Sequence, residues 1–99
     1  MKAMIETQDV IDMANFYEIS EFDLFRLAYT WWHGRFPDER TIEGDFRDYM
    51  FERKVPFYVR QFVRENPFVT DSGSILEEWL PVLEQLKGKT RKSSLLNVA

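Results

Sequence analysis

The segment from residue 20 to residue 34 constrains the fold more than any other part of the chain. Ser20 is a favourable N-cap, and Gly34 suits the left-handed position that follows a helix, so the segment predicts a helix over residues 21–33. Most of its circumference is apolar, and such helices are usually packed on several sides. We therefore expect this helix to be the stability centre, with Phe25 and Trp32 buried. Four of its polar side chains cluster in one stripe: Asp23, Arg26, Thr30 and His33.

Helical spacing of apolar residues predicts four further helices, over residues 8–17, 38–53, 56–65 and 74–87. The buried face of the second of these is expected to consist of Ile42, Phe46, Tyr49 and Met50.

Prolines and a capping pattern set the expected bounds of the last two helices. Pro56 suits the first turn of the helix over residues 56–65. Ser74 and Glu77 have the spacing of a capping box at the start of the last helix, inside which Pro81 is expected to produce a kink. The only strand-like run, residues 68–70, is too short to define a sheet.

The whole chain therefore predicts an all-α fold, a small single-domain bundle of about five short helices with an aromatic-rich core. Its 99 residues include 9 Phe, 4 Tyr and 3 Trp, and buried rings remove large apolar areas from water, which helps so short a chain to form a core. We expect the helical domain to span residues 1–88 and residues 89–99 to form a flexible, disordered basic tail.

Charge is distributed unevenly along the chain. The net charge is −4, but residues 1–86 carry nine basic and 17 acidic side chains, a net charge of −8. The four remaining basic residues follow: Lys87, Lys89, Arg91 and Lys92. Net acidity of the helical domain argues against nucleic acid as the main partner, because phosphate binding requires a basic surface.

The sequence carries few residues suited to catalysis. Cysteine is absent, no nucleotide-binding glycine motif or nucleophile elbow is present, and His33 is the one histidine. We expect His33 to be a solvated or helix-end cation rather than a general base or metal ligand. Asp45 and Asp48 are three residues apart and could share a cation, but a solvated acidic face is favoured. The sequence thus predicts a protein that is not an enzyme and needs no metal or cofactor.

Two adjacent tryptophans leave two interpretations open. Trp31 and Trp32 diverge by about 100° on a helix, so both are buried only if the helix is packed on two sides. This is the favoured interpretation. In the alternative, one indole lines an exposed groove, where tryptophan is a favoured interface residue.

A compact basic cluster interrupts the acidic body on either side of Pro56. We predict that it is a docking surface for a protein partner with an acidic surface, because arginine binds carboxylates in a bidentate manner. The alternative is local pairing of these cations with acids such as Glu52 and Glu65. The predicted partner-binding residues are Arg53, Lys54, Arg60 and Arg64, with Tyr58 at the edge.

These features together predict a non-catalytic protein–protein interaction module or an accessory or adaptor subunit. The alternative is a nucleic-acid-binding helical domain that uses the helix-turn-helix-like segment of residues 41–65, whose second helix carries Arg60, Gln61 and Arg64. The start of the sequence lacks the pattern of a signal peptide, and no apolar run is long enough for a membrane span. We therefore expect a cytoplasmic protein, without membrane contact, that is a monomer or a weak dimer.

Overall fold

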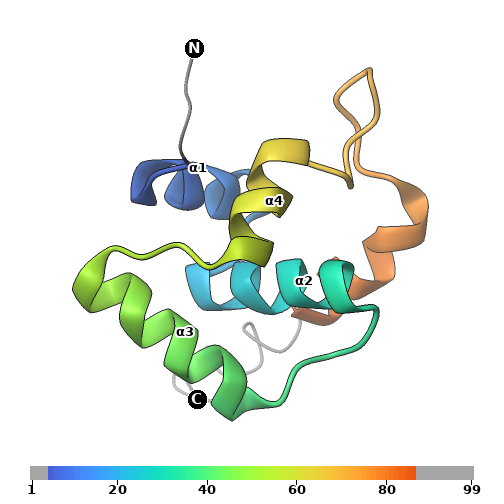
Figure 1. Cartoon of the computed structure of the whole chain (residues 1–99). Coiled ribbons are helices and arrows are strands. Elements are labelled where there is room, and N and C mark those ends of the chain that lie inside the picture. Colours follow the sequence, from blue (N-terminus) through green and yellow to red (C-terminus); the bar gives the residue numbers. More distant parts are fainter. Residues whose placement is uncertain (1–4, 87–99) are drawn as a thin grey trace, which may run out of the picture. The chain divides into compact units, whose positions relative to one another are not determined.

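The computed structural model describes residues 5–86, and the chain divides into two compact units, residues 1–66 and residues 67–99. The first unit contains α1 (Thr7–Tyr17), α2 (Glu21–His33), α3 (Glu39–Glu52) and α4 (Phe57–Glu65), which Figure 1 shows as blue to yellow ribbons. The prediction of an all-α fold is confirmed. The predicted tail, residues 89–99, lies outside the described residues.

Helix α2 is the central element of the first unit, as the sequence predicts. The Ser20 hydroxyl accepts a hydrogen bond from the Asp23 amide at 3.0 Å, and Gly34 ends the helix in the left-handed conformation at φ 75°. Helix α2 contacts α1, α3 and α4, and in Figure 1 it lies between α3 and the pair α1 and α4. Its fully buried side chains are Leu24, Phe25, Leu27 and Ala28.

The two outer faces of α2 differ from the sequence prediction. Trp32 is 45% exposed, so the prediction that it is a core residue is wrong, and Trp31 is half-buried. The polar stripe is not uniformly solvated either. Asp23 and Thr30 are buried, because the Thr30 hydroxyl donates to the Arg26 carbonyl oxygen at 2.8 Å and the Asp23 carboxylate accepts from the Arg26 guanidinium at 3.3 Å.

Helices α1 and α4 pack on each other as well as on α2. Tyr17 at the end of α1 is buried, its ring lies 5.9 Å from that of Phe62 in α4, and its hydroxyl donates to Asn66 Oδ1 at 2.8 Å. Because Asn66 is the left-handed C-cap of α4, this bond joins the ends of the two helices. Val10 and Val59 are also completely buried.

Helix α3 packs on α2 through aromatic rings. Phe46 and Tyr49 lie 5.2 Å and 5.1 Å from Phe25, centroid to centroid, and Ile42 is completely buried. Met50, the fourth predicted member of this face, is 57% exposed, so that prediction is wrong. A residue eight positions after Ile42 is rotated by about 80° from it, which places Met50 at the margin of the contact.

The described part of the second unit, residues 67–86, differs from the predicted long helix. Val69 and Ile75 form an isolated antiparallel bridge, so Ser74 belongs to a loop and does not cap a helix. The helical part begins later, with a 3-10 turn at Glu77–Trp79 followed by α-helical residues 80–86. Pro81 thus lies in the first turn of the α-helical part, where its missing amide costs no hydrogen bond, and not in the interior of a long helix as predicted.

None of the helices within residues 5–86 has the length and apolar character that a membrane crossing requires.

Candidate protein-binding surface

The four predicted basic residues, here called the basic surface, lie at and after the turn between α3 and α4. Arg53 is the left-handed C-cap of α3 at φ 57°, and Pro56 is the N-cap of α4. Because α4 advances 100° per residue, Arg60 and Arg64 project from the same side of the helix, opposite its buried face. That buried face consists of Tyr58, Val59 and Phe62.

Three of the four cations line one shallow depression of about 380 Å³, here called the cationic depression. Arg64 is not among its lining residues and follows Arg60 by one turn of α4. Among the described residues, the lining contains no acidic side chain, so the depression is a positively charged site with aliphatic walls. It consists of Ile5, Arg53, Lys54, Val55 and Arg60.

Among the described residues, intramolecular pairing accounts for only one of these cations. Lys54 Nζ lies 3.3 Å from Glu52 Oε1, in an exposed pair of the kind that contributes little to stability. Within residues 5–86, Arg53, Arg60 and Arg64 form no ion pair. Other exposed arginines, such as Arg40 of α3, also lack one, so a missing ion pair does not by itself mark a binding site.

Arg60 differs from the other arginines in its environment. Its Nε atom is buried and has no hydrogen-bond acceptor within the described part of the chain. Its guanidinium carbon lies 5.8 Å from the centroid of the Phe57 ring, within the range of a cation–π contact. This burial of a donor distinguishes Arg60 from Arg53 and Arg64 of the basic surface.

Exposed aromatic rings adjoin Arg60. The rings of Phe57 and Trp32 meet edge to face with centroids 5.1 Å apart, and they are 50% and 45% exposed. We call them the aromatic pair. Sequence reasoning left open which tryptophan is exposed, and it missed Phe57. Phe57 could have been identified from the sequence, because it lies one helical turn before Arg60 on the outward side of α4.

Tyr58, predicted at the edge of the surface, is buried instead. Its hydroxyl donates to Asp45 Oδ2 at 2.6 Å and so ties α4 to α3. Burial, and then the hydrogen bond to Asp45, raise the pKa of Tyr58. Asp45 and Asp48 line a second depression together with Arg60 and Phe57, so negative charge borders the basic surface on this side.

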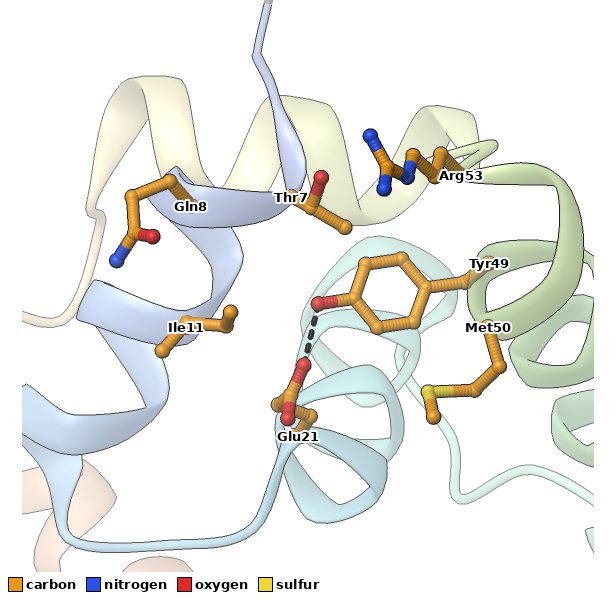
Figure 2. A pocket seen from close by; sticks show the side chains of 7 residues that line it. All are labelled: Thr7, Gln8, Ile11, Glu21, Tyr49, Met50 and Arg53. Carbon is orange, nitrogen blue, oxygen red and sulfur yellow. Dashed lines mark hydrogen bonds between the residues drawn. The ribbon is translucent and has the colours of Figure 1, made fainter.

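A larger pocket of about 440 Å³ lies between α1, α2 and α3. Figure 2 shows the Tyr49 hydroxyl directed at Glu21, to which it donates a hydrogen bond, with Ile11 from α1 across the pocket and Arg53 at the rim. Burial and the carboxylate of Glu21 raise the pKa of Tyr49. Arg53 lines both this pocket and the cationic depression, so the two are neighbours.

The residues considered for catalysis or metal binding lie on two helices, His33 on α2 and Asp45 and Asp48 on α3. His33 is exposed in the last turn of α2, with its ring 4.1 Å from that of Tyr29. Among residues 5–86, no group of three or more histidine, aspartate or glutamate side chains is arranged to hold a metal ion.

Comparison with models of known protein families, with curated proteins and with solved structures finds no match to this chain.

Proposed function

We propose that this protein is a non-catalytic protein–protein interaction module, an accessory or adaptor subunit that captures an acidic partner through Arg53, Lys54, Arg60 and Arg64. The observation that carries the proposal is the cationic depression, where Arg53, Lys54 and Arg60 meet with no acidic side chain among the described lining residues. A carboxylate from a partner would supply the opposite charge.

The chemistry of the surrounding residues supports the same function. Arginine binds carboxylates through two parallel N–H···O bonds, and tryptophan and arginine are the residues most enriched among energetically dominant interface positions. Phe57 offers an exposed ring next to Arg60, and the exposed ring of Trp32 lies against Phe57. Rings add apolar contact area at low entropic cost, whereas the cations mainly set the association rate and specificity.

Nucleic acid binding through the helix-turn-helix-like segment remains the second candidate. It is favoured by the outward side of α4, where Arg60, Gln61 and Arg64 follow one another. Two features disfavour it: the net charge of −8 over residues 1–86, and the carboxylates of Asp45 and Asp48 beside Arg60, which would repel phosphates. Binding of random duplex DNA that weakens steeply with salt would favour this candidate over protein binding.

Reversing two charges of the basic surface is expected to abolish partner capture without unfolding the protein. In the double variant Arg60→Glu, Arg64→Glu, the new carboxylates repel an acidic partner, while neither replaced side chain forms an intramolecular ion pair within the described residues. We expect a nearly unchanged melting temperature by circular dichroism and loss of the native partner from pull-downs analysed by mass spectrometry.

The matched control is Arg40→Glu, Arg47→Glu on α3, which changes the net charge equally at two exposed arginines outside the basic surface. This control should retain the partner. A large fall in melting temperature for the first double variant would mean that these arginines are structural. Undiminished capture of the partner by the Arg60, Arg64 double variant, or an equal loss of capture in both double variants, would contradict the proposed function.

A further inference from the structure

We propose, building on the proposed function, that the partner binds through a short segment in which an aspartate or glutamate lies next to an aromatic or large aliphatic residue. The carboxylate occupies the cationic depression, and the apolar side chain packs on the aromatic pair. The inference names the chemistry of the bound segment, which the proposed function leaves open.

The lining of the cationic depression selects a carboxylate. Arg53, Lys54 and Arg60 contribute positive charge, and the remaining lining residues, Ile5 and Val55, are aliphatic. A carboxylate side chain satisfies both features, because its oxygens accept hydrogen bonds from the cations while its methylene groups contact the aliphatic walls.

The aromatic pair selects an apolar neighbour for that carboxylate. The ring centroid of Phe57 lies 5.8 Å from the guanidinium carbon of Arg60 and 5.1 Å from the ring centroid of Trp32. The carboxylate site and the apolar site are therefore adjacent, at a separation that neighbouring or near-neighbouring residues of one peptide can span. An aromatic or large aliphatic side chain would cover two rings that are otherwise half exposed to water.

The acids beside the surface limit how much negative charge the segment carries. Asp45 and Asp48 share a depression with Phe57 and Arg60, so a second carboxylate placed there would meet like charge. The preferred segment thus has a single acid at the anchor and an uncharged or basic residue toward α3. A polyphosphate chain, which carries charge at every unit, fits this arrangement less well.

The test is selection of random phage-displayed dodecapeptides on the immobilised full chain. We expect enrichment of sequences with an acidic residue next to Phe, Trp, Tyr or Leu. Selected peptides are then synthesised with blocked ends and measured by fluorescence anisotropy. Replacing the acid by its amide, or the apolar residue by alanine, should each weaken binding by at least about tenfold, the scale of a dominant interface contact.

Variants of the protein assign the two sites. Arg60→Gln should reduce the preference for the acid over its amide, because only Arg53 and Lys54 remain as cations in the depression. Trp32→Ala should reduce the preference for the apolar residue while the acid preference persists. Phe51→Ala is the matched control, because Phe51 is 83% exposed on α3 and lies outside the aromatic pair. Circular dichroism verifies that each variant is folded.

Two kinds of result would overturn the inference. One is enrichment of no motif, or of a motif without an acid. The other is peptide binding that Arg60→Gln and Trp32→Ala leave unchanged. Tighter binding of a random single-stranded oligonucleotide than of the best peptide would overturn the inference as well. If the native partner is captured in an Arg60-dependent manner while acidic apolar peptides fail, the proposed function stands and only this inference falls.

Discussion

Replacing Phe25 by alanine is expected to lower the free energy of unfolding by about 3–5 kcal/mol, the range for removal of a buried aromatic side chain. Phe25 is completely buried in α2 and contacts the rings of Phe46 and Tyr49 from α3. The substitution therefore leaves a cavity at the contact between the two helices. Because small domains are stable by only about 5–15 kcal/mol, the loss is a large fraction of the total. Urea denaturation followed by circular dichroism measures it.

Trp32→Ala is the control for this prediction and should cost less than half as much. Trp32 lies on the same helix and has a larger side chain, but it is 45% exposed. Its replacement removes a surface contact with Phe57 and leaves no closed cavity. Equal destabilisation by the two variants would mean that Trp32 is a core residue after all. If Phe25→Ala unfolds at the same midpoint urea concentration as the unmodified protein, α2 is not the stability centre.

Alkaline conditions are expected to unfold the protein in a pH range where the stability of an ordinary helical domain changes little. Three tyrosines are buried with their hydroxyls hydrogen-bonded to other side chains: Tyr17 to Asn66, Tyr49 to Glu21 and Tyr58 to Asp45. Burial raises the pKa of Tyr17 to about 12, and burial together with a neighbouring carboxylate raises the pKa of Tyr49 and of Tyr58.

The sign of the effect follows from which state loses protons first. Unfolded tyrosine ionises near pH 10, below the raised pKa of the folded form, so above pH 10 the unfolded state binds fewer protons and becomes favoured. The stability is fully present below about pH 10 and declines as the pH rises toward the folded pKa. The slope is about 1.4 kcal/mol per pH unit for each such tyrosine.

Melting temperatures between about pH 8 and pH 11 test this prediction, with tyrosinate absorbance recorded in parallel. The fall in melting temperature should coincide with the appearance of tyrosinate. Tyr17→Phe is the informative variant: it loses the hydrogen bond to Asn66, so it is less stable at neutral pH, but its stability should fall less steeply above pH 10. An unchanged slope in that variant, or a flat melting profile, would contradict the assignment.

Local sequence signals determined where the helices of the first unit lie. Ser20, Gly34 and Pro56 mark helix ends through interactions within one turn, so their effect does not depend on the rest of the fold. The spacing of apolar residues is also a local property of one segment, and it identified α2 as the central helix. The positions of the cations on either side of Pro56 could also be read from the sequence, because a turn and a helical period of 3.6 residues place them.

Tertiary packing decided which side chains of those helices are exposed. Trp31 and Trp32 are equally apolar, and only the positions of α1, α3 and α4 around α2 leave the second one half exposed. Tyr58 is buried because Asp45 of α3 accepts its hydroxyl hydrogen bond, a pairing across 13 residues that no local rule predicts.

The same distinction applies to the second unit and to the proposed site. Ser74 and Glu77 have capping-box spacing, but the bridge between Val69 and Ile75 holds Ser74 in a loop, so backbone pairing across the loop overrode the capping preference. At the site, the sequence determined the residue types and the charge of the basic surface. Only the tertiary structure placed Trp32 of α2 beside Phe57 of α4, because this contact joins two helices that are distant in the sequence.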